Sequence, residues 1–370
     1  MKIGIDAAPL IQPFGGIANY AKHLLQALLE LKSGDIFFGY IPTGMRARLP
    51  WPAEKYSGQM NWVEVSPLSF RGRGSYDQLD VYHGTNFKVQ TSGRHGTVLT
   101  IHDLWLDRYP EYSKKLFGQR LSFMRTKRRV HRATRVIAVS EFTASEVQTL
   151  YDLPPTRVSV VYHGMSKEFF PDAGEETDYY ALRERLGIPD KPFILFVGGA
   201  NPRKNHQSLL KAFALNEFFR QGFSLVLVGS PTFKKISIKR NIHDLNLGNS
   251  VVCIDQLPPE ELRILYSRTS LFVFPSKYEG FGFPVLEAMA CGASVVTSRC
   301  SALPEVSGDA AVLVDPDNVQ ELEQAMLSVL QDPKVQETFR RRGRKQAASF
   351  NWTRAAEETL RVYQSIVSSH

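Results

Sequence analysis

The chain has 370 residues, of which 43% are hydrophobic and 22% charged, and these values exclude a disordered or collagen-like protein. No run of about 18 consecutive apolar residues occurs, so the sequence predicts no membrane-spanning helix. The net charge of +8 lies entirely in residues 1–170, which hold 22 basic and 14 acidic side chains, whereas residues 171–370 hold 23 of each. The second half is therefore not a basic nucleic-acid binder, and the first half is expected to face an anionic partner or surface.

The first residues and the cysteines indicate the compartment. Residues 1–6 read as a strand. They do not fit a signal peptide, because Asp6 comes too early for its apolar region. Cys253, Cys291 and Cys300 form neither a C-x-x-C pair nor an even framework, which favours a reducing environment. We therefore expect a cytoplasmic protein.

Short apolar, β-branched runs alternate with helical patterns along the whole chain, which is typical of strands buried on both faces of a parallel sheet. In the first half these runs are 2–6, 36–41, 62–65, 81–83, 98–102, 136–140 and 158–162. In the second half they are 193–197, 225–229, 251–254, 271–274, 294–297 and 311–314. A linker rich in Pro, Gly and acidic residues is expected near 165–178. The sequence thus predicts an α/β protein with two Rossmann-like domains.

Residues 279–287, Glu-Gly-Phe-Gly-Phe-Pro-Val-Leu-Glu, follow a predicted strand and open a helix. Gly280 and Gly282 let the backbone approach a ligand closely, and the amides of a helix start favour an anion. Glu279 is expected on the loop and Glu287 inside the helix, so two carboxylates flank an anion cradle. This pattern suits a phosphate between two polyhydroxylated parts, as in a nucleotide-sugar, and the alternative is two unrelated surface glutamates.

Residues 197–205, Val-Gly-Gly-Ala-Asn-Pro-Arg-Lys-Asn, also follow a strand and open a helix. The Arg203 guanidinium and the Lys204 ammonium suit a diphosphate and would stabilise its charge as it departs. The alternative is a solvated basic helix start, although cations are electrostatically disfavoured at that end of a helix.

Candidate residues in the first half also follow predicted strands, where ligands bind in open parallel sheets. Gly15 and Gly16 fit either a tight turn or a close backbone approach to a ligand. His102 ends a strand, and Asp103 either orients His102 or caps the next helix. Ser140 either donates to a phosphate or caps a helix. The first loop is not G-x-G-x-x-G, which counts against a nicotinamide dinucleotide site.

Taken together, these motifs resemble the retaining glycosyltransferases of family 4, and more narrowly their bacterial mannosyltransferase-like members. The shared features are the Glu-x7-Glu string, the Gly-Gly-Ile loop, the His-Asp-Leu run at 102–104 and the Asn-Pro-Arg-Lys-Asn run at 201–205. The resemblance implies the GT-B fold, in which two Rossmann-like domains face each other across a cleft. It implies an acceptor-side domain at 1–170 and a nucleotide-sugar donor domain at 171–350, with the last helix, 351–370, packed back on the first.

The resemblance also implies a role for each candidate residue. The implied catalytic residues are His102, Arg203, Lys204 and Glu279. The implied donor-binding residues are Gly15, Gly16, Ser140, Arg203, Lys204, Glu279, Phe281, Gly282, Phe283 and Glu287. Within this set the two cations would grip the diphosphate, Glu279 and His102 would contact the donor sugar, and Glu287 would accept from the ribose hydroxyls.

Gly199 and the Asp-x-Asp sequence at 315–317 bear on how a diphosphate or a metal could be bound. Gly199 stands where many members have an arginine five residues before the lysine, which leaves Arg203 as the expected guanidinium on the phosphates. Asp315-Pro316-Asp317 has the form of a metal–nucleotide Asp-x-Asp motif, but its place after a strand favours a turn and helix cap. We therefore expect no catalytic metal.

Basic residues crowd one predicted helix in the first half. They are Arg120, Arg125, Lys127, Arg128, Arg129, His131, Arg132 and Arg135. Because apolar residues are interspersed, this helix suits anionic lipid headgroups or an acceptor diphosphate, and a solvated basic face is the alternative. The expectation is peripheral attachment to the inner face of the cytoplasmic membrane.

The resemblance implies transfer of a hexose to a hydroxyl of a glycan or lipid-linked glycan, as in cell-surface polysaccharide assembly. GDP-mannose is the leading donor candidate, and UDP-glucose or UDP-N-acetylglucosamine is the second. The nucleotide-sugar is a substrate, so no cofactor is expected. Two other classes stay open, namely a sugar-nucleotide epimerase and a non-catalytic binder of anionic surfaces.

Overall fold

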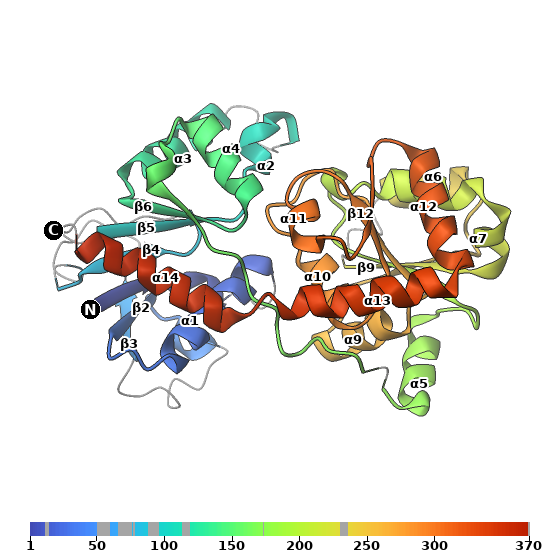
Figure 1. Ribbon diagram of the computed structural model, residues 1–370, viewed down its shortest axis with the longest axis horizontal. Coiled ribbons are helices and arrows are strands. Elements are labelled where there is room, and N and C mark those ends of the chain that lie inside the picture. Colours follow the sequence, from blue (N-terminus) through green and yellow to red (C-terminus); the bar gives the residue numbers. More distant parts are fainter. Residues whose placement is uncertain are drawn as a thin grey trace. The chain divides into compact units, whose positions relative to one another are not determined.

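The computed structural model describes residues 1–11, 15–49, 60–65, 76, 78–87, 96–112, 119–172, 174–229 and 236–368. The chain forms two compact units, one made of Met1–Gly164 with Asn351–His370 and the other of Met165–Phe350 (Figure 1). The chain thus leaves the first unit after Gly164, rather than at the expected boundary of 170, and returns to it at Asn351.

The first unit contains, within its described residues, a seven-stranded parallel sheet in the order β3-β2-β1-β4-β5-β6-β7. Its strands are β1 Lys2–Asp6, β2 Ile36–Pro42, β3 Met60–Val65, β4 Val81–Gly84, β5 Gly96–Ile101, β6 Arg135–Ala138 and β7 Val158–Val160. Its α-helices are α1 Gly16–Glu30, α2 Trp105–Arg108, α3 Gln119–Arg132, α4 Glu141–Tyr151 and α14 Trp352–Val367. Its 3-10 helices are η1 Ala8–Ile11, η2 Arg46–Arg48, η5 Pro110–Tyr112 and η6 Pro155–Arg157.

The second unit contains, where it is described, a six-stranded parallel sheet in the order β10-β9-β8-β11-β12-β13. Its strands are β8 Phe193–Val197, β9 Ser224–Val228, β10 Val251–Ile254, β11 Leu271–Phe274, β12 Val295–Ser298 and β13 Val312–Val314. Its helices are α5 Glu176–Leu186, η7 Pro202–Lys204, α6 His206–Leu215, α7 Glu217–Gly222, α8 Ile236–Asp244, α9 Pro259–Arg268, α10 Phe283–Ala290, α11 Leu303–Ser307, α12 Val319–Gln331 and α13 Pro333–Ala348.

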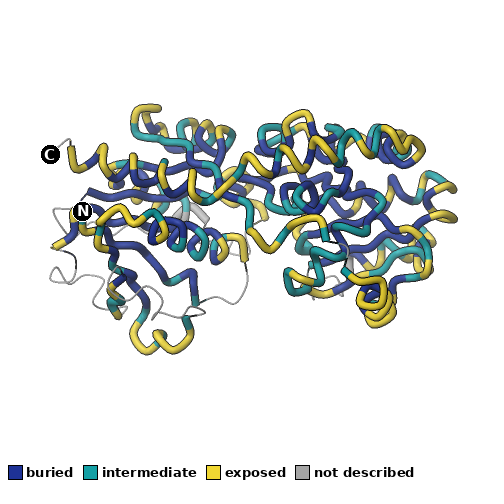
Figure 2. Tube along the Cα trace, turned by 60° about the horizontal axis from the view of Figure 1, so that its bottom comes forward, coloured by how far each residue is buried: buried dark blue, intermediate teal, exposed yellow. Residues whose placement is uncertain are grey.

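The central strands are buried because helices cover the sheets. Every residue of β5, β8, β9, β11 and β12 is buried. Figure 2 shows the buried segments of both units in dark blue. A strand covered on both faces needs apolar side chains at successive positions, which explains the continuous apolar runs in the sequence. Each expected strand is present, with its ends within two residues of the expected ones. The predicted α/β class with two Rossmann-like domains is confirmed.

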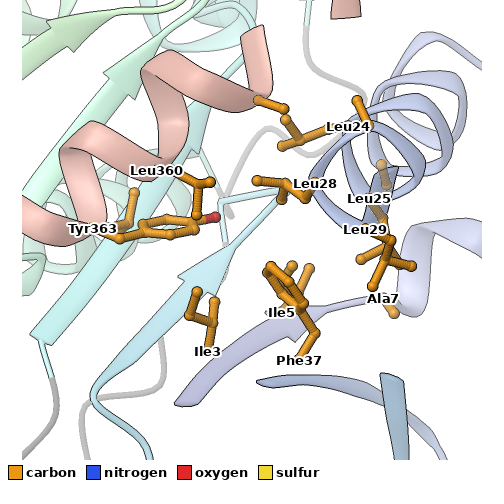
Figure 3. Close-up of a cluster of buried hydrophobic side chains, with 14 of the residues drawn as sticks. Ile3, Ile5, Ala7, Leu24, Leu25, Leu28, Leu29, Phe37, Leu360 and Tyr363 are labelled. Carbon is orange, nitrogen blue, oxygen red and sulfur yellow. The ribbon is translucent and has the colours of Figure 1, made fainter. Parts of the chain in front are cut away.

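Helix α14 supplies part of the core of the first unit. Leu360 and Tyr363 of α14 point toward Leu24 and Leu28 of α1 and toward Ile5 of β1 (Figure 3). Burial of an aliphatic or aromatic side chain contributes about 1.5–3 kcal/mol, so α14 stabilises this unit substantially. The last helix is therefore an integral part of the first unit.

A glycine in the sheet makes room for α14. A Cβ atom at Gly96 of β5 would lie 2.1 Å from Cγ2 of Ile366, far inside van der Waals contact. Ile366 is itself 2% exposed. Close packing of α14 on the sheet therefore requires glycine at position 96.

Candidate functional site

The candidate site of the second unit lies where β8 and β11 end. These strands are neighbours and parallel, so the loops that follow them meet at one edge of the sheet. Lys204 Nζ lies 2.6 Å from Glu279 Oε1, and Arg203 Nη1 lies 3.7 Å from Glu279 Oε2. The structure thus brings together three residues that the sequence predicted as catalytic, although they lie some 75 positions apart.

The loop that carries the two cations is held by asparagine side chains. The Asn201 side chain accepts a hydrogen bond from the Arg203 amide at 3.1 Å. Asn205 adopts the left-handed conformation, with φ of 57°, which asparagine tolerates better than most residues. The Asn205 side chain donates to the Pro316 carbonyl at 2.6 Å and accepts from Ser208 at 2.9 Å. These bonds fix the turn into α6 and hold the cationic side chains in place.

Glu279 is buried, with 6% exposure, and its carboxylate is fully partnered. Besides the two cations, the Ser276 hydroxyl donates to Glu279 Oε1 at 2.6 Å. The Glu279 amide donates to Ser301 Oγ at 3.1 Å, which fixes the backbone. Burial raises the pKa of Glu279, but Lys204 and Arg203 outweigh that effect and leave the pKa below its ordinary value. Glu279 is therefore ionised at neutral pH.

The start of α10 depends on Gly282. This residue has a φ of 116°, which side-chain-bearing residues rarely adopt, and a Cβ there would lie 2.9 Å from Leu303 Cδ2. Pro284 occupies the first turn, as the sequence predicted. Glu279 lies on the loop and Glu287 in the helix, which confirms their expected placement. The donor-binding role of the amides of residues 281–283 remains a prediction.

Glu287 is partly exposed and has a different environment from Glu279. The Tyr266 hydroxyl donates to Glu287 Oε2 at 3.0 Å. Burial raises the pKa of Glu287 to about 7, against the lowering effect of the Tyr266 hydrogen bond, and Glu168 adds a further increase. The carboxyl group is thus near its titration point at neutral pH. Sequence reasoning missed Tyr266, because a tyrosine in a helix of the preceding α/β unit carries no distinguishing signal.

In the first unit, His102 follows β5 directly and is partly exposed. Its Nε2 lies 2.8 Å from the Thr85 carbonyl oxygen. Burial lowers the pKa of His102, although the Thr85 carbonyl and Asp103 act in the opposite direction. Asp103 Oδ1 accepts from the Trp105 amide at 3.2 Å, just before α2, whose N-cap residue is Leu104. A role of Asp103 in orienting His102 remains a prediction.

Two other candidates in the first unit precede helices. Gly15, with φ of 137°, lies just before α1, which begins at Gly16. Ser140 is fully buried and caps α4, since its hydroxyl oxygen accepts from the Thr143 amide at 3.0 Å. The structure therefore shows the capping alternative for Ser140, and contact with a phosphate remains a prediction.

The Asp-x-Asp sequence forms a turn. The Asp317 amide donates to Asp315 Oδ1 at 2.9 Å, and Asn318 caps α12 by accepting from the Glu321 amide. Asp317 also pairs with Lys277. This geometry confirms the interpretation of the sequence as turn and cap, with Asn318 as the capping residue.

Family models match both units of the chain. Residues 14–169 match "Glycosyltransferase Family 4", and residues 179–346 match "Glycosyl transferases group 1". The chain is a family 4, group 1 glycosyltransferase. The resemblance drawn from the motifs is thus confirmed at the level of the family.

Sequence relatives of this glycosyltransferase include mannosyltransferases. It is 28% identical to O-antigen chain mannosyltransferase B of Escherichia coli, over 98% of this chain and 100% of that protein. It is 29% identical to the serotype-specific mannosyltransferase WbdA of Escherichia coli over 74% of this chain, but that match spans 34% of WbdA. O-antigen chain mannosyltransferase RfbU of Salmonella typhimurium is 28% identical over 65% of this chain and 63% of its own length.

Solved structures of glycosyltransferases share the fold. Sucrose-phosphate synthase from Thermosynechococcus elongatus superimposes with a TM-score of 0.76 at 21% identity, over 100% of both chains. HepE of Anabaena, solved in complex with UDP and glucose, gives a TM-score of 0.74 at 18% identity, over 99% of this chain and 100% of HepE. These similarities confirm the expected GT-B fold.

In the part of the chain that the structure describes, no helix combines the length and apolar character needed to cross a bilayer.

Proposed function

We propose that this glycosyltransferase moves a hexose, with retention of anomeric configuration, from a nucleoside diphosphate sugar to a hydroxyl of a glycan or lipid-linked glycan. The observation that carries the proposal is the convergence of Lys204 and Arg203 on Glu279, with Glu287 in the helix that follows the same loop. Two fixed cations suit a diphosphate, and two carboxylates suit the hydroxyl groups on either side of it.

The chemistry follows from the charges. When the anomeric carbon–oxygen bond breaks, negative charge grows on the departing diphosphate, and preorganised cations stabilise that charge. In the front-face transfer that we propose, the acceptor oxygen bonds to the anomeric carbon while its proton passes to the departing phosphate oxygen. The protein then needs no side chain that acts as a general base, and Glu279 accepts hydrogen bonds from sugar hydroxyls.

Mannose from GDP-mannose is the leading donor. The support comes from the names of three relatives, which are mannosyltransferases at 28–29% identity. A UDP-sugar is the alternative, and HepE, which binds UDP and glucose, shares the GT-B fold at 18% identity. The O-antigen relatives also suggest a polysaccharide acceptor for this chain.

We also propose that the first unit contacts an anionic membrane surface through α3. The side chains of Arg125, Arg128, Arg129 and Arg132 are exposed there, and Met124 is 64% exposed beside them. The Arg120 side chain lies outside the described residues. Exposed cations with an exposed apolar side chain suit the interface of a bilayer with anionic headgroups. Binding to phosphatidylglycerol vesicles, weakened by salt and by Arg128→Glu/Arg129→Glu, tests this proposal, and equal binding to neutral vesicles would contradict it.

The donor site is tested first by a thermal-shift titration with GDP, UDP, ADP and dTDP. A ligand at 100 times its Kd stabilises the folded state by about 2.7 kcal/mol, which a melting curve resolves readily. We expect a shift with GDP that is lost in Lys204→Ala and kept in Lys277→Ala, whose exposed lysine pairs with Asp317. A shift with UDP alone would select the alternative donor, and no shift with any nucleotide would overturn the proposal.

Product analysis then tests the reaction class. Incubation with GDP-mannose and an acceptor should give a product whose anomeric configuration, measured by NMR, matches the donor. An epimerase would instead change the donor sugar with no acceptor present. Activity that survives a chelator would support the absence of a catalytic metal, and activity restored only by a divalent cation would contradict it.

A further inference from the structure

A row of packed aromatic rings in the first unit joins His102 to helix α14. The ring of His102 lies 5.6 Å from that of His163, at an interplanar angle of 28°. His163 lies 5.7 Å from Trp352 at 34°, and Trp352 lies 5.5 Å from His23 at 21°. His163 is 3% exposed and lies three residues after the end of β7, whereas His102 directly follows β5. His163 is therefore the buried member of the row, whereas His102, Trp352 and His23 are partly exposed.

Tyr20 of α1 supports the row from the side. Its ring lies 4.7 Å from His102, edge to face, and 4.8 Å from His163. Its hydroxyl lies 2.9 Å from Thr100 Oγ1. Tyr20 thus touches both histidines and is itself anchored to β5.

A chain of hydrogen bonds continues from Thr100 to α14. Thr100 Oγ1 lies 2.7 Å from His83 Nε2, and His83 Nδ1 lies 2.6 Å from the Tyr363 hydroxyl. Burial lowers the pKa of His83 to about 3, so His83 is neutral and one ring nitrogen donates while the other accepts. Helix α14 therefore reaches the surroundings of His102 by two routes, through Trp352 and through Tyr363.

The approach of α14 to His163 depends on the next residue, Gly164. A Cβ atom at Gly164 would lie 2.2 Å from the Trp352 amide nitrogen and 2.6 Å from Trp352 Cγ. Any larger residue would push Trp352 away. The glycine lets the two segments meet, and the row of rings is the result.

The contact of His102 with Thr85 decides its tautomer. A carbonyl oxygen only accepts, so His102 Nε2 carries the hydrogen in the 2.8 Å bond to Thr85. Burial and the neighbouring histidines disfavour a second proton on this cluster. His102 Nδ1 then holds a lone pair, which accepts a hydrogen bond and cannot donate one.

We propose that His163, Tyr20 and Trp352 are positioning residues that hold His102 in the Nε2–H form, with Nδ1 ready to accept a hydrogen bond from a donor-sugar hydroxyl. The inference rests on the proposed function for its last step, since that function assigns His102 to the donor sugar. Helix α14 therefore serves the chemistry of the first unit as well as its core.

Nitrogen NMR of histidine-labelled protein tests the inference without an assay of activity. Native His102 should show one protonated and one unprotonated ring nitrogen from pH 8 down to pH 6. His163→Leu and Trp352→Leu should give averaged tautomers and a His102 pKa closer to its ordinary value. His163→Phe, which keeps a flat ring, should restore the native pattern. Unchanged His102 signals in both leucine variants would overturn the inference.

Leu360→Ala is the matched control, because Leu360 lies on the same helix and points toward the aliphatic side chains of Leu24 and Leu28 in α1. Equal changes at His102 in this control and in Trp352→Leu would also overturn the inference, since general loosening of α14 would then explain both.

Kinetics separate this inference from the proposed function. His163→Leu should lower kcat by about ten- to a hundredfold, as small misplacements of catalytic groups do, and leave the Kd for GDP unchanged. His163→Phe should recover most of that loss. Wild-type transfer by His102→Ala would overturn the role of His102 in the proposed function, whereas equal kcat values in His163→Leu and wild type would overturn the positioning role.

Discussion

The Lys204 ammonium lies 2.6 Å from a Glu279 carboxylate oxygen, and both side chains are largely buried, with 13% and 8% exposure. A buried ion pair of this kind is costly to break by removal of one partner, because the other charge stays behind without compensation. A diphosphate that arrives at Lys204 would compete with Glu279 for the same cation. Under the proposed function, the pair would couple donor binding to the freedom of Glu279 to contact a sugar.

Removal of either cation should impair transfer. We expect Lys204→Ala and Arg203→Ala each to lower kcat by a factor of about 10²–10³, because each removes one preorganised cation that stabilises the charge on the departing diphosphate. Steady-state assays with the donor identified by thermal shift would measure this. Lys277→Ala, which removes an exposed lysine on the loop that carries Glu279, should stay within about twofold of wild type. Wild-type rates in both variants would show that the diphosphate does not bind at Lys204 and Arg203.

Donor binding should depend on the ionisation of Glu287. Its pKa of about 7 means that the carboxyl group is mostly protonated at pH 6 and mostly ionised at pH 8. Because ribose hydroxyls bind the ionised form better, the donor KM should fall roughly tenfold over that range. Tyr266→Phe removes the bond that lowers this pKa and should move the transition to higher pH. A pH profile that Glu287→Gln leaves unchanged would assign the dependence to another group.

The same shift predicts how stability changes with pH. The folded-state pKa of Glu287 lies above its ordinary value of 4.5, so the unfolded state binds fewer protons between these values. The contribution of the Glu287 carboxyl group to the free energy of unfolding is complete below pH 4.5 and is lost as the pH rises through 7. Glu287→Gln removes this loss, so its Tm should exceed that of the wild type at pH 8 by several degrees. Melting curves at pH 6 and 8 would measure the difference, and a lower Tm for the variant at pH 8 would contradict it.

Gly96→Ala should destabilise the first unit. The added methyl group would clash with Ile366 of α14, and overpacking of this kind costs about 1–3 kcal/mol. Chemical denaturation would measure the loss. Ile366→Ala removes the clashing atoms, so the double variant should be more stable than the two single losses predict. Gly222→Ala, with open space around the position, is the control. Simple additivity in the double variant would show that α14 does not pack on β5 as described.

Gly199→Arg should strengthen nucleotide diphosphate binding. No heavy atom lies within 4 Å of a Cβ placed at Gly199, so an arginine fits without a backbone shift. One added charge-assisted hydrogen bond is worth about 1.5–3 kcal/mol, so the Kd should fall about tenfold or more. Gly199→Ala separates the side chain from any backbone effect and should bind as the wild type does. Weaker binding by the arginine variant in isothermal titration would show that Arg203 already fills this role.

Much of the fold could be predicted because the strands of a buried parallel sheet appear in the sequence as short continuous apolar runs. The run at 271–274 and the following glycine-rich loop predicted a strand, a loop and a helix in the right places, and these positions carry Glu279 and Glu287. The rule that parallel strands end at one edge placed both loops on the same side of the sheet, but the pairing of Glu279 with Lys204 was not predicted. The contact itself required the order of β8 and β11, which local patterns do not encode.

The supporting residues were beyond sequence reasoning for a physical reason. Ser276, Ser301 and Tyr266 act through single hydrogen bonds whose partners lie on other elements, and no period or spacing marks them. His163 carried a weak signal, since it comes directly after the predicted strand at 158–162, although β7 itself ends at Val160. Ser140 shows the reverse case, where a residue at a strand end serves the next helix.

The return of the chain at Asn351 sets the order in which the molecule can assemble. The second unit is one continuous segment, so it has all its residues once Phe350 has been synthesised. The first unit lacks Leu360, Tyr363 and Ile366 until the segment after Phe350 has also been synthesised. The unit that is begun first is therefore completed after the second unit, and an apolar face of its nascent sheet stays uncovered until α14 has been made.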